Sequence, residues 1–500
     1  MEVPVSTPAL MQSSLLAAAL SLGLGAVPAQ ATDLLIQDVT VLSPERTAPL
    51  THRDVLIRDG RIASVAASPM PVPAGVSRLD GRGRFLTPGL MDSHVHVSSM
   101  GGLPEDGSEP GLVADYVRQQ PRSYLYFGVT QVLDLAGFDE SIARFRAQPQ
   151  KPDLFRCGAV TAWKGYPMVF MPEALHGAMN FVVEPGQEKR LPAGIDPAAH
   201  TPEAAVAKVA QSGALCVKVF IEDGFGEAHG WPILSADSLK RVREAAHKAG
   251  LLLVAHANAY DMQLRAVDAR VDVIAHGMWN WNGVAADAPL PSAIAALLQR
   301  IHQQGIGFQP TQRVIGGMGD LFAEATLGDP LFAKVSTPGQ RAFYASSKGQ
   351  FFKNTLRADF PAKARDADIA GVYARINAQS GRVLSALHAL GQPLLLASDT
   401  PSAPVYANQP GLNTYQEMLA LAKAGLPLDA IFRAGTLNNA RQFRLDRDYG
   451  TVEAGKIANL LLLDANPLQD ITAWNQIERV IVHGEAIDRA SLAAQAGPQT

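Results

Sequence analysis

The sequence predicts a (β/α)8 barrel of the TIM type together with a small β-sandwich domain that is built from both ends of the chain. Two observations predict this α/β architecture. Within residues 87–445, short apolar runs alternate with helical patterns, which is typical of a parallel sheet with crossover helices. On both sides of this region, residues 32–86 and 446–490 contain strand-like runs, and neither of these two ranges has a helical pattern of its own.

The barrel prediction depends on eight strand candidates in the middle of the chain. They are residues 86–96, 128–135, 153–161, 214–221, 251–256, 271–276, 305–311 and 393–399. Helical stretches such as 238–249 and 369–390 lie between or beside them, and eight strand–helix repeats close a barrel. Residues 320–365 are expected to form a long irregular insertion, either a lid at the catalytic face or an elaborated surface loop.

The terminal pieces carry the signals of short antiparallel strands. Residues 33–42, 54–58 and 61–65 alternate in polarity, and Asp59-Gly60 between the last two is a hairpin signal. Residues 458–464 and 477–487 have the same strand-like pattern of short apolar runs, with His483-Gly484 as a turn. Since neither piece has enough strands to bury its own apolar face, we expect the two to pair into one small domain. Residues 491–500 are a tail.

Residues 1–31 differ in kind from the rest and are expected to be a signal peptide. The apolar run 15–27 is too short to span a bilayer, and Ala29 and Ala31 are the small residues that a signal peptidase needs. Glu2 and the lack of a preceding Lys or Arg depart from the usual pattern, so an uncleaved anchor is the alternative. We expect export to the periplasm or outside the cell, with no stable membrane insertion once the leader is removed.

Composition excludes some partners and leaves others open. Five hundred residues with 47% hydrophobic content can bury a large core, and 43 basic against 47 acidic residues lack the basic footprint of a nucleic-acid binder. Cys157 and Cys216 cannot make a disulfide framework and fit no Cys-x-x-Cys zinc pattern. Cys216 lies two positions before Lys218 and is expected to be a core thiol in a deeper layer of the barrel. An oligomer is compatible with the sequence.

Six side chains fall at the carboxyl ends of the predicted strands, where barrel enzymes place their reactive groups. His94 and His96 are one residue apart, so in a strand both point to the same face and can converge on one metal ion. The other strand ends supply Lys218, His256, His276 and Asp399. A core histidine, a capping aspartate or a snorkelling lysine would explain each residue alone, but six together at one rim indicate a metal site.

These motifs resemble those of the metal-dependent amidohydrolase superfamily. Residues 88–96, Pro-Gly-Leu-Met-Asp-Ser-His-Val-His, are similar to its opening signature, and residues 450–460 with 466–468 are similar to its return into the small β domain. Within the superfamily, the chain is similar to the imidazolonepropionase-related and Xaa-Pro or Xaa-Arg dipeptidase-like branch. Lys218 stands where binuclear members have a carboxylated bridging lysine. Ala275 is a departure, because many relatives carry Glu there.

The resemblance implies two divalent metal ions, which we expect to be zinc. His94, His96 and Asp399 would hold one metal, His256 and His276 the other, and a carboxylated Lys218 would bridge them. An unmodified ammonium would repel the cations, whereas a carbamate is anionic and offers two oxygens. Alternatively, Lys218 pairs with Glu222 or Asp223 away from the site, which would leave a single metal.

The expected function is hydrolysis of a small-molecule amide: a dipeptide, an N-acyl amino acid or a cyclic amide. A metal-bridging hydroxide would attack the carbonyl, and Asp399 would take its proton and pass it to the departing amine. A mononuclear deaminase or lactam hydrolase is one alternative, and a non-catalytic binding or scaffold protein on the same fold is another. Weaker candidates are the loop histidines His176 and His229, and Trp279 and Trp281, which would form a wall of the pocket. Arg313, Lys164 and Tyr260 are candidates for polar contacts with the substrate.

Overall fold

The computed structural model describes residues 33–495 apart from 73, 105, 226–228, 285–289 and 403. The expected signal peptide and the last five residues of the tail lie outside the described residues. Over the part that is described, every helix is too short or too polar to cross a bilayer.

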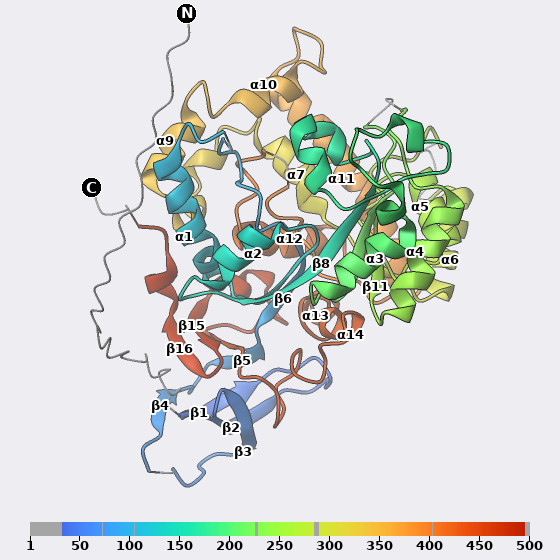
Figure 1. Ribbon diagram of the computed structural model, residues 1–500. Coiled ribbons are helices and arrows are strands. Elements are labelled where there is room, and N and C mark those ends of the chain that lie inside the picture. Colours follow the sequence, from blue (N-terminus) through green and yellow to red (C-terminus); the bar gives the residue numbers. More distant parts are fainter. Residues whose placement is uncertain are drawn as a thin grey trace, which may run out of the picture.

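Seven parallel strands form the barrel wall (Figure 1). In spatial order they are β6 (Leu90–Val95), β7 (Val129–Asp134), β8 (Asp153–Ala162), β10 (Cys216–Phe220), β11 (Leu252–His256), β12 (Val273–Ala275) and β13 (Gly307–Gln309). Each lies within or overlaps one of the first seven predicted ranges. The fold class that the sequence predicts is therefore confirmed.

The first predicted strand is in fact two strands that belong to different domains. β5 (Phe85–Pro88) pairs within the small β domain, and β6 begins the barrel after Gly89. A side chain at Gly89 would place its Cβ 1.9 Å from Thr130 Oγ1, so only glycine fits this passage between the sheets. The pattern of polar and apolar residues continues through both strands without a break, which is why the sequence predicts a single strand there.

The eighth wall segment closes the barrel without a regular strand. Residues 393–399 form only isolated bridges, Leu394 with Phe308 and Thr400 with Val95 at its margin. Leu395 N donates to Phe308 O at 3.1 Å on one side, and Ser93 N donates to Leu396 O at 3.0 Å on the other. The Ser398 amide donates to the Asp92 side chain instead of to a strand carbonyl, which interrupts the ladder.

Helices cover the outside of the barrel in the order expected for crossovers (Figure 1). In α4 (Ala236–Lys248) the buried residues Leu239, Val242 and Ala246 recur at helical spacing, and Ser235 caps its first turn. The other helices before residue 312 are α1 (Pro110–Tyr126), α2 (Asp139–Arg146), α3 (Pro202–Gln211), α5 (Tyr260–Asp268) and α6 (Ser292–Gln303). After the eighth segment come α12 (Leu412–Lys423), α13 (Leu428–Arg433) and α14 (Asn439–Gln442).

The insertion at residues 320–365 contains three short helices joined by turns and loops, which corrects in part the expectation of an irregular insertion. After α7 (Gln312–Asp320) it contains α8 (Phe332–Val335), α9 (Pro338–Ala345) and α10 (Phe351–Arg357), and it leads into α11 (Asp366–Ala389). Thr337 and Gln340 form a capping box at the start of α9. These helices are short, so their periodicity is too brief to read from the sequence.

The terminal pieces combine into one small β domain, drawn at the foot of Figure 1. The strands are hydrogen-bonded in the order β16 (Glu485–Asp488), β15 (Ile477–Val482), β14 (Leu460–Leu463), β5, β1 (Leu34–Val41), β2 (Leu50–Arg58) and β3 (Arg61–Ala67), with β4 (Ser77–Asp80) beside β1. The two ends of the chain meet where β5 pairs with β14. Asp59 and Gly60 both have positive φ in the β2–β3 hairpin, as their turn type requires.

Cys157 and Cys216 form a disulfide between neighbouring barrel strands, so the expectation of a free core thiol at Cys216 was wrong. The two residues are direct partners in the parallel pairing of β8 with β10, and their Cα atoms are 4.5 Å apart. Both side chains are buried, as was expected for Cys216. The pairing depends on strand register, which the separation of 59 residues does not reveal.

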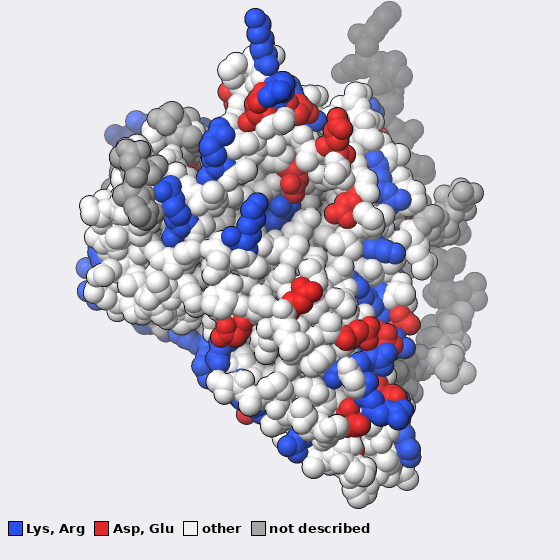
Figure 2. Space-filling model, turned by 180° about the vertical axis from the view of Figure 1, so that it is seen from behind, with Lys and Arg blue, Asp and Glu red and all other residues white. Residues whose placement is uncertain are grey.

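Charged side chains are interspersed on the face shown in Figure 2. Basic and acidic residues alternate there across broad uncharged areas, and neither sign forms a continuous patch on that face. This distribution agrees with the nearly balanced charge of the sequence.

Candidate metal centre

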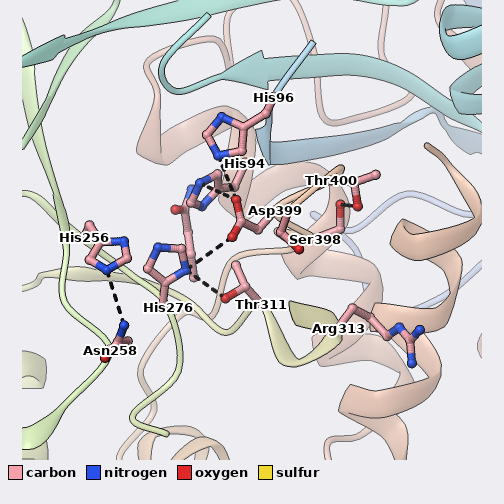
Figure 3. A network of polar contacts seen from close by, with 12 residues as sticks. His94, His96, His256, Asn258, His276, Thr311, Arg313, Ser398, Asp399 and Thr400 are labelled. Carbon is pink, nitrogen blue, oxygen red and sulfur yellow. Dashed lines mark hydrogen bonds and ion pairs between the residues drawn. The ribbon is translucent and has the colours of Figure 1, made fainter. Parts of the chain in front are cut away.

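The structure brings the six predicted residues together at the carboxyl ends of the barrel strands. Five of them are labelled in Figure 3, and the sixth, Lys218, lies within electrostatic range of all four histidines. His94 and Lys218 lie within β6 and β10, and His256 ends β11. His96 and His276 lie just past the ends of their strands, and Asp399 lies on the eighth segment. The predicted rim is therefore a single cluster.

Asp399 occupies the middle of this cluster (Figure 3). Its Oδ1 lies 3.0 Å from His94 Nε2 and 2.8 Å from His96 Nε2, and its Oδ2 lies 3.8 Å from His276 Nδ1. Asp399 Oδ1 and both ring nitrogens of His94 are buried and make no well-aligned hydrogen bond among the described residues, although Oδ1 lies close to the Nε2 atoms of His94 and His96. The candidate ligand atoms of His94, His96 and Asp399 all lie within 4.8 Å of one another, so this donor set fits one metal ion.

His276 and His256 extend the cluster on the other side. The His276 ring centroid is 5.1 Å from that of His94 and 4.4 Å from that of His256. Burial lowers the pKa of His94 to about 3, and it also lowers the pKa values of His256 and His276. These rings are therefore neutral at neutral pH, which is the form of histidine that binds metals.

Lys218 is enclosed and unpaired. Its side chain is 1% exposed, and its Nζ has no hydrogen-bond partner in the described part of the chain. Burial lowers the pKa of Lys218 to about 7, although the charge of Asp399 opposes this shift. The alternative pairing with Glu222 or Asp223 is not present, because Glu222 contacts His256 and Asp223 contacts His229.

Two residues of the cluster and the neighbouring Thr311 have left-handed backbone conformations. The φ angles are 88° at His276, 43° at Thr311 and 56° at Asp399. Such conformations cost non-glycine residues about 1–3 kcal/mol each and gather at functional sites. Thr311 Oγ1 lies 3.1 Å from His276 Nδ1, so two of these residues are also in side-chain contact. The surrounding fold therefore holds these residues in backbone conformations that they would not favour by themselves.

Parts of this chain are similar in sequence to known proteins. Residues 351–487 match the amidohydrolase family. The L-hydantoinase of Paenarthrobacter aurescens is 31% identical over 68 residues, which are 14% of each chain. The imidazolonepropionase of Klebsiella pneumoniae subsp. pneumoniae is 42% identical over 62 residues, which are 12% of this chain and 15% of that one.

Solved structures cover almost the whole length. A prolidase complexed with N-methylphosphonate-L-proline has a TM-score of 0.64 at 22% identity, over 92% of this chain and 100% of that one. A. niger ochratoxinase has a TM-score of 0.62 at 18% identity, over 92% of this chain and 96% of the ochratoxinase chain. Residues 351–487 are therefore similar in sequence to the amidohydrolase family, and the chain as a whole shares the fold of these solved structures. Its matches span only 14% and 17% of the lengths of an L-hydantoinase and a D-hydantoinase, and the solved structures establish the shared fold.

Several acidic residues that support the histidine cluster were not predicted from the sequence. Glu222 Oε2 lies 2.9 Å from His256 Nε2 and accepts a hydrogen bond from Asn258 Nδ2 at 2.6 Å. Glu222 is fully buried. It therefore orients the His256 ring and leaves Nδ1 as the nitrogen available for a metal.

Asp92 and Asp134 hold the backbone around the two histidines of the opening signature. Asp92 accepts hydrogen bonds from the amides of His94 and Ser398, which join β6 to the eighth segment. Burial raises the pKa of Asp92 to about 6. Asp134 accepts from the Val97 amide at 2.6 Å and fixes the chain just after His96. The position of Asp134 at a strand end was a signal that could have identified it.

Trp279 lies in the place expected of a pocket wall, whereas Trp281 does not. The Trp279 ring is 5.2 Å from the His276 ring. Trp281 is buried under the Arg382 guanidinium, 4.7 Å from its ring centre, and its indole donates to Met278 O. Of these two tryptophans, Trp279 is therefore the one in ring contact with the histidine cluster.

Most of the weaker polar candidates have side-chain partners of their own. Arg313 donates to Asn413 and Asp320 and points away from the cluster in Figure 3. Lys164 pairs with Glu173, and His229 pairs with Asp223. The remaining two are His176, whose Nε2 lies 3.1 Å from Met171 O, and Tyr260, whose amide donates to Asn280 O as α5 begins.

Proposed function

We propose that this chain is a metal-dependent hydrolase that cleaves the carbon–nitrogen bond of a small amide: a dipeptide, an N-acyl amino acid or a cyclic amide. The observation that carries the proposal is the convergence of the candidate ligand atoms of His94, His96 and Asp399, all within 4.8 Å of one another, at the carboxyl ends of the barrel strands. The side chain of His96 is 23% exposed, so a substrate can reach this set from solvent. Relatives named hydantoinase and N-acetylglucosamine-6-phosphate deacetylase support the same reaction class.

Two divalent cations, which we propose to be zinc, would be held by these residues. His94, His96 and Asp399 would hold one, and His256 and His276 would hold the other. Lys218 would bridge them after its neutral amine adds to carbon dioxide, forming a nitrogen–carbon bond and releasing the proton of the amine. The resulting carbamate carries a negative charge and two oxygens. The buried Nζ supports this modification, because an ammonium there would have no hydrogen-bond partner among the described residues.

The metals would supply an acidified water, whose pKa falls from about 15.7 to roughly 7, and would polarise the scissile carbonyl. Asp399 would accept the proton of that water and deliver it to the departing amine nitrogen. Its position at the centre of the histidine rings suits both tasks. Trp279 would limit the space beside His276 and exclude water from that side.

A screen of purified zinc-loaded protein tests this proposal. Dipeptides, N-acyl amino acids, lactams and lactones are supplied with and without a chelator, and amine or acid release is measured. We expect turnover of at least one amide class, loss of turnover on chelation and recovery with zinc. A folded protein that binds no metal and cleaves no amide would instead be a non-catalytic scaffold on the same fold.

A mononuclear deaminase or lactam hydrolase is the second candidate, because the compact ligand group found among the described residues consists of His94, His96 and Asp399. Adenine deaminases are among the relatives, for example one from Deinococcus deserti that is 39% identical over 67 residues. A zinc content near one per chain, with no mass of carbon dioxide on Lys218, would favour this candidate.

We also propose that the protein is exported and that residues 1–31 are removed as a signal peptide. The disulfide between Cys157 and Cys216 supports this, since disulfides persist mainly in oxidising compartments. Amino-terminal sequencing of the protein from its native host should give a first residue near Thr32. A mature protein that retains Met1 would contradict cleavage.

A further inference from the structure

Five aromatic rings form a continuous group beside His256, and we name it the aromatic ladder: Phe220, Tyr166, Trp231, Phe225 and Phe170. Two of them, Tyr166 and Phe170, lie in the segment after β8. The other three lie at the end of β10 and in the segment that follows it. These are the chain segments through which barrel proteins recognise ligands.

The inner end of the ladder touches the candidate metal centre. The Tyr166 ring centroid is 4.9 Å from that of His256, and the Phe220 ring is 6.1 Å from it. Tyr166 and Phe220 contact each other edge to face at 5.6 Å. Phe220 is buried and Tyr166 is half-buried, so this end is part of the packed rim. A group bound against Tyr166 would therefore lie next to the proposed reaction centre.

The outer end of the ladder reaches solvent. Phe225 is 48% exposed and Phe170 is 64% exposed, and their rings stack at 6.1 Å. Phe225 is 5.5 Å from Tyr166, which links the exposed rings to the inner ones. Trp231 stacks on Tyr166 at 6.1 Å and meets Phe225 edge to face at 5.1 Å. Large apolar surface left in water at the rim of a site marks a binding surface.

We infer that the aromatic ladder binds an aromatic or large apolar group of the substrate. This rests on the proposed function and narrows its substrate class to amides that carry such a group next to the scissile bond. The nearby charges do not favour a charged group, because Lys164 is paired with Glu173 and Asp223 with His229. Covering apolar surface is favourable by roughly 25 cal/mol per Å², and an aromatic pair adds about 0.5–1.5 kcal/mol. The continuity of the rings with His256 favours substrate over a second copy of the chain as the occupant.

Binding of two small acids tests the inference without turnover. Calorimetry compares 4-phenylbutyrate with butyrate on the zinc-loaded protein, on the double variant Phe170→Ala/Phe225→Ala and on Phe351→Ala. Phe351 is the matched control, because it is 44% exposed but lies on α10, outside the ladder. We expect the phenyl compound to bind the wild type at least about tenfold more tightly, and this ratio to fall at least about threefold in the double variant only.

Turnover provides the second arm. For N-acetylated phenylalanine, leucine and alanine amides, we expect kcat/KM to rise with the size of the apolar group, and the double variant to lose this ranking mainly through KM. A wild type that binds both acids equally, or a double variant that keeps the full preference, would overturn the inference. Self-association that the double variant abolishes, with no effect on ligand preference, would also overturn it. Absence of turnover with intact phenyl preference would sink the proposed function and leave the aromatic site standing.

Discussion

His94 and Asp399 are joined twice, once through the backbone and once through their side chains. The Asp399 amide donates to the His94 carbonyl at 2.8 Å, and the Asp399 Oδ1 lies 3.0 Å from His94 Nε2. The backbone bond is part of the closure between the first and last wall segments of the barrel. Closing the barrel and assembling the first candidate ligand pair are therefore the same structural event.

Replacing Asp399 by Asn should abolish most activity and weaken metal binding. An amide cannot accept the proton of the water, and loss of a general base typically lowers the rate by about 10²–10⁴. Steady-state kinetics and metal analysis measure both effects. Asp464→Asn is the control, because Asp464 pairs with Arg84 in the small β domain. Equal activity of the two variants would remove Asp399 from the mechanism.

Replacing Lys218 by Ala should remove the bridging group and reduce both metal content and turnover. Short carboxylic acids should restore part of the activity, because they can supply the two oxygens of the missing carbamate. Lys164→Ala is the control, since Lys164 is exposed and paired with Glu173. Mass spectrometry of native protein should show one added carbon dioxide that is absent from the variant. Full activity of Lys218→Ala without any additive would contradict the bridging role.

Replacing Glu222 by Gln should loosen the second candidate ligand without removing it. Because Glu222 orients His256, we expect metal affinity to fall by roughly 10–100-fold. Competition with a chelating dye measures the affinity. The neighbouring acid Asp223 contacts only His229 among the histidines of the rim, so Asp223→Asn should retain wild-type affinity. Unchanged zinc binding in Glu222→Gln would show that this carboxylate does not position a ligand.

The contact between His483 and Asp153 should make stability depend on pH. His483 Nε2 lies 2.8 Å from Asp153 Oδ1, and this bond raises the pKa of His483 above its ordinary value, although burial opposes it. The stabilisation is thus fully present below about pH 6.5 and is lost as pH rises through the raised pKa. Because the side chain is half-exposed, we expect at most about 1 kcal/mol.

Thermal unfolding at about pH 5.5 and about pH 8.5 measures this contribution, and His483→Gln should shrink the difference between the two melting temperatures. His388→Gln, on α11, is the matched control. If both variants change the difference equally, the contact contributes nothing specific.

Removing the disulfide should lower stability and leave the metal site in place. Cys157→Ala/Cys216→Ala frees a cross-link that spans 59 residues, and native disulfides typically contribute about 2–4 kcal/mol. Urea unfolding measures the loss, and zinc content reports on the site. A double variant with unchanged unfolding would show that packing of β8 against β10 suffices.

The sequence predicted the barrel and its rim because both depend on local patterns. Successive side chains of a strand point to opposite faces, so His94 and His96 must point to the same face. Apolar runs indicate buried strands in any part of the chain. The split at Gly89 was not predictable in this way, because it depends on the distant Thr130 side chain. The helices of residues 320–365 were missed because one or two turns give too little periodicity.

By itself, then, the sequence determined the fold class, the two-ended β domain and the six side chains at the strand ends. Only the tertiary structure decided their partners: Glu222 on His256, Asp92 across β6 and the eighth segment, Cys157 on Cys216, and the aromatic ladder beside the site. The physical reason is that these contacts depend on the register and separation of segments that are far apart in the chain. The alternation of side chains and the ends of strands depend on neighbouring residues in the sequence. The register between strands is fixed only when the sheets close and pack.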